Sequence, residues 1–413
     1  MVPKGWSHTT LGKVMVFKNG LNFTKADVGE EIKIVGVSDF KDLSELRSTE
    51  RLESVNVASH IKDDELLTDG DLLFVRSNGN KDLIGRCLFF PEVKERLSFS
   101  GFTIRGRADK KNILPQYIAF VARSSFFKSQ ISQYGGGTNI SNLSQQILND
   151  IALPLPPHDE QKKIVQILST WDKAISTTEQ LLANSQQQKK ALMQQLLTGK
   201  KRLLDNNGVR FSGEWKAQRI GSLLKEVKRP VQWDDDSEYH LLSVKRRSEG
   251  VVLREILKGS DILTKKMNTA LAGDFLISKM QVVHGATGLV TEEFNKCHIS
   301  DSYIALRPKD DEKIDIAFFS WFSKQKIMYH KAFLCSYGVH IEKMTFNFNM
   351  FVKEKVIIPA TLEEQQKIAA VLSTADQKIT ALQQKLDALK QEKKALMQQL
   401  LTGKRRVKVE EVA

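Results

Sequence analysis

The stretch Lys189–Lys200 reads KKALMQQLLTGK, and the same twelve letters return at Lys393–Lys404. The correspondence extends without a gap from Glu160–Lys200 onto Glu364–Lys404, where 24 of 41 positions are identical at a shift of 204 residues. Identity over this length does not arise by chance in a mixed composition. An internal duplication therefore decides the architecture of the chain.

The repeated stretch has the composition of a helix. It is rich in Ala, Leu, Met, Gln, Lys and Glu, and it contains no Gly or Pro before its end. Thr361 and Glu364 have the spacing of a capping box. The copies end at Gly199 and Gly403, the residue type that most easily adopts the left-handed C-terminal turn.

Inner Ser-Thr-x-Asp signals at Ser169–Asp172 and Ser373–Asp376 indicate a break inside each copy. We therefore expect a short helix followed by a long one in each half, near 160–168 and 172–198, and near 364–372 and 376–402.

Apolar residues recur at spacings of three and four along both long helices, as in coiled coils. In the second copy, interrupted by Lys393, they are Ile379, Leu382, Leu386, Leu389, Leu396 and Leu400. In the first copy they are Ile175, Leu182, Leu192 and Leu196. Thr178 and Ser185 make the first seam too polar for a strong homomeric zipper, so we expect it to pair with the second copy of the same chain. The alternative is two unrelated surface helices, each packed on its own domain.

The composition limits the class of protein. A chain of 413 residues can form more than one core, and 41% hydrophobic with 27% charged residues is typical of a soluble globular protein. There is no signal-peptide pattern and no apolar run long enough to span a membrane. The three cysteines form no metal or disulfide pattern, which favours the cytoplasm. A net charge of +13 makes a nucleic acid the first partner to consider.

The duplication extends beyond the helical stretch. Trp6 and Trp215 each open a half, and each is followed at the same spacing by an apolar residue and a glycine. Unit boundaries near 1–207 and 208–413 follow, with the turn-prone Asp205–Gly208 as the link.

The variable part of each half is mostly strand and turn. Gly70–Val75 and Gly273–Ile277 predict matching strands that lead into polar loops. Helices are expected near 115–131 and 315–331. The loops that follow differ almost completely between the halves, which predicts one scaffold that reads two different targets.

The arms have a length that suits DNA. A helix of about 27 residues spans about 40 Å, and half-sites one turn of B-DNA apart are about 34–36 Å apart. Two domains at opposite ends of such arms would contact one side of a duplex about one turn apart, at a split and asymmetric site.

These residues resemble the DNA-specificity subunit of type I restriction–modification systems. The marks are the Glu-Gln motifs at Pro156–Ile164 and Glu364–Ile368, both copies of KKALMQQLLTGK, the two tryptophans and the two Gly-Asp strands. The resemblance covers essentially the whole chain. It implies an α+β chain with an internal pseudo-twofold repeat, in which two similar mixed α/β target-recognition domains, at 1–155 and 204–359, are separated by an antiparallel coiled coil of helical arms, at 156–203 and 360–413.

The resemblance also implies partners. Each domain would read one half of a bipartite site on double-stranded DNA, the arms would set the spacing and bind two methyltransferase subunits, and restriction subunits would join the complex. The chain itself would be non-catalytic. The assembled complex would carry the adenine-N6 methyltransferase and ATP-dependent endonuclease activities.

The residues themselves show no catalytic constellation. Adenine-methyltransferase, cofactor-loop and Walker motifs are absent from the sequence. Glu31–Lys33 and Glu92–Lys94 are half of a nuclease signature without an acidic partner. Cys297-His298 is better explained as structure than as a metal site. We therefore expect neither a cofactor nor a metal.

Basic and amide side chains in the predicted loops are the candidates for DNA contacts, since Arg reads guanine, Asn or Gln reads adenine, and Lys mostly holds phosphate. In the first domain they are Arg76, Asn78, Asn80, Lys81, Arg86, Arg105, Arg107, Lys110, Lys111, Thr138 and Asn139. In the second they are Lys245, Arg246, Arg247, Lys265, Lys266, Lys279, Gln281, His284, His340 and Lys343.

Two other functions compete with DNA specificity. One is a stand-alone nuclease or methyltransferase with a degenerate site, which would bind a cofactor. The other is a coiled-coil scaffold whose domains bind protein, which would bind without the salt dependence that phosphate contacts give.

Overall fold

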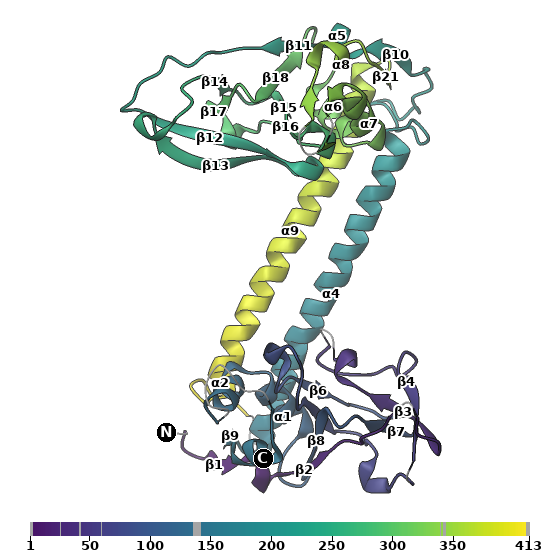
Figure 1. Ribbon diagram of the computed structural model, residues 1–413, viewed down its shortest axis with the longest axis vertical. Coiled ribbons are helices and arrows are strands. Elements are labelled where there is room, and N and C mark those ends of the chain that lie inside the picture. The colour runs from purple at the N-terminus through teal and green to yellow at the C-terminus, as the bar shows by residue number, and fades with distance from the viewer. Residues whose placement is uncertain are drawn as a thin grey trace. The chain divides into compact units, whose positions relative to one another are not determined.

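The computed structural model describes residues 3–24, 26–40, 43–58, 60–134, 142–338, 340–341 and 344–409. Internal contacts divide the chain into two units. Unit 1 comprises Met1–Gln180 and Gln384–Ala413, and unit 2 comprises Leu181–Gln383. Each unit thus combines one globular domain with part of each long helix (Figure 1).

Unit 1 contains short strands, three short helices and the start of the first arm. The strands are β1 (Ser7–Thr10), β2 (Met15–Asn19), β3 (Glu30–Val35), β4 (Glu53–Val57), β5 (Leu72–Val75), β6 (Cys87–Phe89), β7 (Leu97–Phe99), β8 (Thr103–Ala108) and β9 (Ala152–Leu155). The helices are α1 (Pro115–Ala122), α2 (Ser125–Tyr134), α3 (Gln145–Asp150) and α4 (His158–Leu196), of which the part after Gln180 belongs to unit 2.

Unit 2 repeats this order with additions. The strands are β10 (Lys216–Arg219), β11 (Leu224–Val227), β12 (Glu238–Lys245), β13 (Gly250–Lys258), β14 (Met267–Ala270), β15 (Phe275–Ser278), β16 (Thr287–Leu289), β17 (Cys297–Ser300), β18 (Tyr303–Pro308), β19 (Ser336–Tyr337), β20 (Thr345–Phe346) and β21 (Lys355–Ile358). The helices are α5 (Ile220–Leu223), α6 (Ile316–Ser323), α7 (Lys326–Leu334), α8 (Phe348–Phe351) and α9 (Leu362–Leu400).

The larger sheets of the two domains have the same topology, with four strands paired in the order β2-β8-β5-β6 in unit 1 and β11-β18-β15-β16 in unit 2. A second sheet has the order β4-β3-β7 in unit 1 and, with one more strand, β13-β12-β17-β14 in unit 2. The pairs β3 with β7 and β12 with β17 are parallel. The first and last strands of each domain pair as β1 with β9 and β10 with β21. These findings confirm two similar domains of mixed α/β content.

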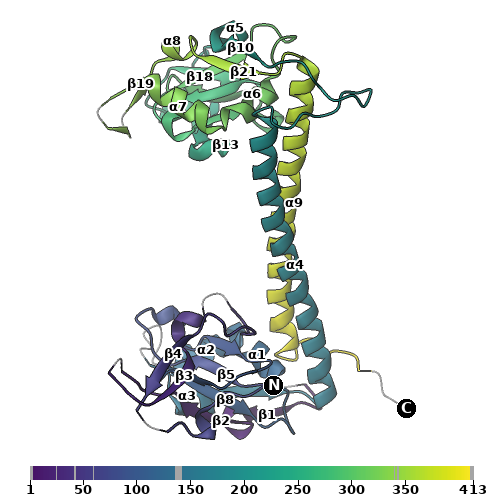
Figure 2. The ribbon, with the colours of Figure 1, turned by 90° about the vertical axis from the view of Figure 1, so that its right-hand side faces the viewer.

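The helices expected near 115–131 and 315–331 are each two helices, which pack on the four-stranded sheet (Figure 2). In unit 1 the break has a local cause: the hydroxyl of Ser124 accepts a hydrogen bond from the backbone N–H of Phe127 at 3.2 Å and so caps α2. Alternating apolar residues alone could not show this cap.

The predicted break inside each arm was wrong, because α4 and α9 are continuous helices of 39 residues each. The hydroxyl of Thr170 donates to the carbonyl of Gln166 at 2.8 Å, so it is satisfied inside the helix rather than at a cap. Asp172 and Asp376 pair instead with Lys393 and Lys189, respectively.

The core of each unit includes residues from both arms. In unit 1, Ile164 and Leu168 of α4 pack in the same cluster as Leu400 and Leu401, at the end of the second arm. In unit 2 the residues shifted by 204 do the same, and they are Ile368, Leu372, Leu196 and Leu197. Burial of these side chains makes the arm ends part of each domain.

The predicted seam lies along the protected side of the helices. Leu182, Leu196, Leu386 and Leu400 are buried, as are the polar Thr178 and Ser185. Ile175, Leu192, Ile379, Leu382, Leu389 and Leu396 are half-buried.

Candidate nucleic-acid interface

A buried aspartate immediately precedes β5 in domain 1. Asp71 is 1% exposed and accepts two hydrogen bonds from Arg107 on β8, at 2.8 Å from Nε and 2.7 Å from Nη2. It also accepts the backbone N–H of Thr68 at 2.8 Å. Gly70 turns the chain with a φ of +86°. The aspartate of the Gly-Asp pair therefore forms a buried ion pair that links two neighbouring strands of the sheet.

Domain 2 has the equivalent buried ion pair, with one more arginine bound to the aspartate. Asp274 is fully buried and accepts from Arg229 at 2.7 and 3.1 Å, and from Nε of Arg307 at 2.6 Å. The backbone N–H of Leu271 donates to it at 2.8 Å. Such charge-assisted pairs hold their geometry tightly.

Two of the predicted DNA contacts, Arg105 and Arg107, also have internal roles. Arg105 is only 4% exposed; its Nη1 donates to the carbonyl of Asp64 at 2.6 Å, and its guanidinium lies 5.8 Å from the ring centre of Phe99. Burial lowers the pKa of Arg105. Arg107 is held by Asp71, which raises its pKa. Arg105 is thus buried inside the domain, whereas the side chain of Arg107 is still 33% exposed, so both stay predictions and Arg105 is the weaker candidate.

The remaining candidates of domain 1 lie at two places. Arg76, Asn78, Asn80, Lys81 and Arg86 lie in and beside the loop after β5, where the side chain of Asn78 accepts the backbone N–H of Asn80 at 2.8 Å. The side chains of Lys110 and Lys111 lie in the loop after β8, where Lys110 donates to the carbonyl of Asp69 at 2.7 Å.

The loop after β5 borders a cleft of about 770 Å³. Its lining includes Asn78, Arg51, Asp39, Glu53, Phe23 and Phe102. The ring of Phe102 is 64% exposed, which is unusual for so large an apolar side chain. Sequence reasoning missed Arg51 and Phe102. Arg51 lies in the long segment between β3 and β4, for which no pattern predicts a position.

In domain 2 several candidates lie around one contact, which Ser248 makes with Gly285 and Tyr329. Ser248 donates its backbone N–H to the carbonyl of Gly285 at 2.8 Å, and its hydroxyl lies 2.6 Å from that of Tyr329. This contact holds the turn between β12 and β13, with its exposed candidates Lys245, Arg246 and Arg247, against the loop of Gln281 and His284.

Other candidates of domain 2 lie elsewhere. Lys265 pairs with Asp235 at 2.6 Å, and Lys279 donates to the carbonyl of Asp301 at 2.6 Å. Lys266 and His340 are exposed. Thr138, Asn139 and Lys343 lie outside the described residues.

The arms are anchored by two equivalent ion pairs. In unit 1 Glu160 pairs with Arg406 and accepts the indole N–H of Trp6 at 3.1 Å. In unit 2 Glu364 pairs with Arg202, whose Nη2 lies 2.7 Å from Oε2. Glu364 is therefore an ion-pair partner, and its capping box with Thr361 stays a prediction. Each pair joins the start of one arm to the segment after the end of the other.

The neighbouring glutamines bind backbone. Gln161 accepts the N–H of Leu114 at 2.9 Å and donates to the carbonyl of Pro156 at 3.0 Å. Gln365 makes the matching bonds to Asp315 at 3.0 Å and Pro359 at 3.1 Å. The repeated Glu-Gln signal thus attaches each domain to its own arm.

Burial makes the thiol of Cys87 unreactive. Burial raises the pKa of Cys87 to about 12, so its thiol stays protonated. Within the described part of the chain, no group of three or more His, Cys, Asp or Glu side chains is placed to hold a metal ion. None of the described helices combines the length and apolar character of a bilayer span.

The comparisons with known proteins agree with this architecture. A family model described as the type I restriction modification DNA specificity domain matches residues 3–184 and 214–391, once for each half. The putative type I restriction enzyme MjaX specificity subunit of Methanocaldococcus jannaschii is 26% identical over 98% of this chain and 95% of its own length. The StySPI specificity subunit of Salmonella potsdam is 29% identical, but the match spans only 44% of this chain and 39% of that subunit.

A solved structure shows the same fold. The HsdS subunit from Thermoanaerobacter tengcongensis superimposes with a TM-score of 0.52 at 20% identity, over 98% of both chains. The chain belongs to the type I restriction–modification DNA-specificity family. It is a specificity subunit, and its function is DNA sequence recognition within such a complex.

Proposed function

We propose that each domain reads one half of an asymmetric, bipartite site on double-stranded DNA. The observation that carries this proposal is one sheet topology used twice with different connections: a long segment, residues 36–52, joins β3 to β4, whereas a short turn joins β12 to β13. Two domains with one scaffold and different loops suit two different half-sites. Base contacts from such loops carry the sequence information, and phosphate contacts set the position.

The candidate readers are the loop residues that the structure leaves at the surface. In domain 1 these are the residues around Asn78 and the loop of Lys110, and in domain 2 the turn of Arg246 with the loop of Gln281. Replacing a phosphate-binding lysine lowers the salt slope of binding by about one and affects all sequences alike. Replacing a base reader relaxes one position of the site.

We further propose that α4 and α9 pair as an antiparallel coiled coil. Within unit 1 Lys390 lies 2.8 Å from Glu179, and Lys393 pairs with Asp172, so residue numbers rise along one helix as they fall along the other. Within unit 2 Lys189 pairs with Asp376 and Arg202 with Glu364 in the same sense. The domains then correspond to 1–155 and 204–359, and the arms to 156–203 and 360–413.

The arms in this proposal set the half-site spacing and bind two methyltransferase subunits, and restriction subunits complete the assembly. The chain is non-catalytic and acts in the cytoplasm, where its DNA lies. The adenine-N6 methyltransferase and ATP-dependent endonuclease activities belong to the partners.

A methylation map tests the proposal. The chain is co-expressed with its methyltransferase, and N6-methyladenine is located across the host genome by single-molecule sequencing. We expect a split, asymmetric motif with a fixed gap. A contiguous motif would show that one domain does the reading, and methylation by the purified chain alone would show that it is an enzyme.

The role of the arms as a spacer has its own test. Four residues inserted within 176–190 lengthen the helix by about 6 Å. We expect the gap in the methylated motif to widen by about one or two base pairs while both half-sequences stay the same. An altered half-sequence with an unchanged gap would contradict this role.

A further inference from the structure

A basic cleft lies in unit 2 beside the end of α4. Its volume is about 1020 Å³, and it lies between the last turns of α4 and the junction of α6 with α7. Five lysines line it and no carboxylate does; they are Lys189, Lys190, Lys200, Lys324 and Lys326. Met193 and Ile379 add apolar surface.

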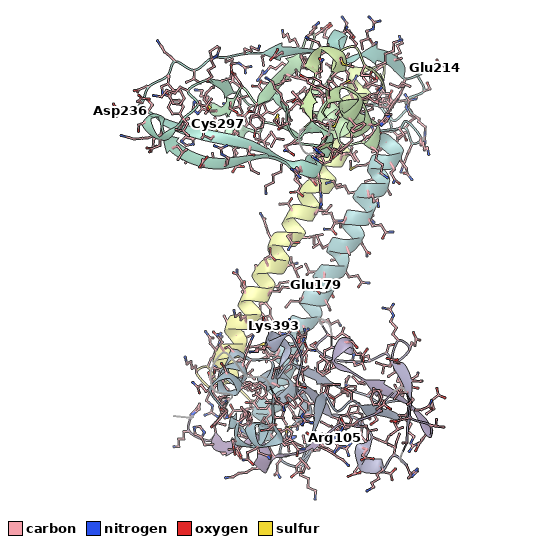
Figure 3. The ribbon with its side chains drawn as sticks, in the orientation of Figure 1. Arg105, Glu179, Glu214, Asp236, Cys297 and Lys393 are labelled. Atoms are coloured by element: carbon pink, nitrogen blue, oxygen red, sulfur yellow. The ribbon has the colours of Figure 1, made fainter. Side chains whose placement is uncertain are left out.

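The matching cleft in unit 1 has about 660 Å³. Its α9 residues include Lys393, Lys394, Met397 and Gln398, which are the residues of the first cleft shifted by 204. Glu179 and Lys393, labelled in Figure 3, lie on the two helices at this cleft. The duplicated sequence therefore builds two related clefts, one in each unit.

Two of the exposed residues in each cleft are identical in the two copies, although packing does not require it. Lys190 and Lys394 are both exposed, as are Gln194 and Gln398. Exposed positions in the middle of the arms have diverged instead: Leu181 corresponds to Lys385, Ala183 to Asp387 and Asn184 to Ala388. A surface that stays identical in two copies, beside one that does not, indicates the same partner at both ends.

The charge of the unit 2 cleft indicates an acidic partner. Lys189 lies 5.0 Å and Lys324 4.2 Å from the ring centre of Trp321. Burial, and then the charge of Lys189, lowers the pKa of Lys324. Asp376, which pairs with Lys189, raises the pKa of Lys324 by less than burial and Lys189 lower it, so this desolvated positive charge is only partly compensated. An anion placed here would relieve the repulsion.

The apolar surface favours a protein over the DNA backbone. Met193, Ile379 and the lysine stems offer area that a phosphate chain does not use, whereas an acidic peptide with apolar side chains covers both. Methionine at such a surface adapts to its partner.

We propose that the two clefts bind two copies of one acidic protein segment, carried by the methyltransferase subunit, and that the unit 2 cleft binds more tightly. This proposal rests on the assignment of the arms as the methyltransferase-binding part of the chain.

The difference in affinity follows from the residues that differ. Asp172 and Glu179 line the unit 1 cleft, and Lys390 lies 2.8 Å from Glu179. Arg123, in the place of Lys324, donates to the carbonyl of Ala119 at 2.8 Å, so part of its guanidinium is already engaged. The unit 1 cleft thus offers less uncompensated charge, and its complex gains less from electrostatic attraction.

The test is a titration of the full chain with purified methyltransferase subunit, without DNA, followed by native mass spectrometry at low and moderate salt. The wild-type chain should bind one copy about tenfold more tightly than the second, with the stronger salt dependence for the first. The double variant K190E/K326E should weaken the first binding step about tenfold, to the affinity of the unit 1 cleft, which is then occupied first. The matched variant K394E should weaken only the second step.

Three results would overturn the proposal. Assembly by K190E/K326E at wild-type affinity removes the cleft as the site, provided that the wild type binds. Equal loss in both steps removes the asymmetry. Weaker binding of duplex DNA by the variant chain alone, with unchanged assembly, assigns the lysines to phosphate contacts. Failure of the wild-type chain to bind the methyltransferase at all would instead contradict the function of the arms. Thermal unfolding of each variant checks that the fold is intact, since Lys190, Lys326 and Lys394 are exposed.

Discussion

Domain 1 and domain 2 share a sheet framework and differ at its edges. In both, a buried aspartate follows a left-handed glycine and binds an arginine on the neighbouring strand, Arg107 for Asp71 and Arg307 for Asp274. Among the described residues, a second arginine binds this carboxylate in domain 2 alone, and it is Arg229. The comparison shows which contacts the fold requires and which each domain has added.

The connections between strands differ far more than these aspartate–arginine pairs. β12 and β13 form a long hairpin, whose turn is clamped by Ser248, whereas β3 and β4 are shorter and separated by the segment that borders the Asn78 cleft. The duplicated framework thus tolerates two unrelated surfaces at the same place. Recognition can therefore change in one domain without altering the core.

The largest effect is expected at the two aspartates. Asp274→Ala leaves two guanidinium groups beside an empty buried site, and we expect a loss of about 4 kcal/mol in the free energy of unfolding. Asp71→Ala frees one guanidinium, which is partly exposed, and should cost about 3 kcal/mol. Urea denaturation of the full chain, with hydrogen exchange to assign the loss to a unit, measures both. Equal losses would mean that Arg229 adds no stability.

The arm ion pairs come next. Arg202→Ala leaves Glu364 buried and unpaired, and we expect a loss of about 3 kcal/mol. Arg406→Ala leaves Glu160 buried as well, but the indole N–H of Trp6 still donates to it and the Arg406 side chain is 45% exposed, so the loss should be smaller, about 1 kcal/mol. The same denaturation experiment compares them. A larger loss for Arg406→Ala would show that the indole of Trp6 depends on this pair.

The two helix-ending glycines give a smaller difference. Gly199 and Gly403 have φ values of +71° and +73°, so alanine at either costs about 1 kcal/mol of backbone strain. An added Cβ at Gly403 would also overlap Pro3, whereas at Gly199 it would lie 3.3 Å from Trp215. We expect Gly403→Ala to lower the melting temperature more than Gly199→Ala. The reverse order would mean that the segment at Pro3 moves freely.

The smallest expected effect is a pH dependence confined to domain 2. Burial lowers the pKa of His298 in β17, so the folded state favours the neutral ring and the unfolded state takes up the proton first. Stability should therefore fall as pH drops from 7 through the usual histidine range, and level off below the folded-state pKa. His298→Ser, which copies Ser98 of β7, should remove this dependence in hydrogen exchange of unit 2. An unchanged pH profile would assign it to another group.

The repeat predicted the pairing of domains with arms because twelve identical residues are a strong signal. The same sequence misled on the arm break: Ser169–Asp172 has a capping pattern, but the Thr170 hydroxyl bonds back along the helix and Asp172 finds a lysine distant in sequence. Local pattern cannot show a partner more than two hundred residues away.

The sequence predicted the fold in more detail than the surroundings of single side chains. A loop arginine and a strand arginine look alike in sequence, so it could not show that Arg105 and Arg107 make hydrogen bonds inside the domain. Conversely, Arg51 and Phe102 gave no signal, because the cleft that brings them together forms only when distant segments meet. The type of each residue predicted what its side chain could bind. The contacts in the folded chain decide which of these side chains are accessible to a partner.

The attachment of Leu400 and Leu401 to the core of unit 1 has a consequence for synthesis on the ribosome. Unit 2 is one continuous segment and has all its residues once Gln383 has emerged, whereas unit 1 lacks part of its core until the final residues appear. Domains usually fold in the order in which they are made, N-terminal first. Here the first-made domain completes last, because the core that contains Ile164 and Leu168 lacks Leu400 and Leu401 throughout the translation of the second domain.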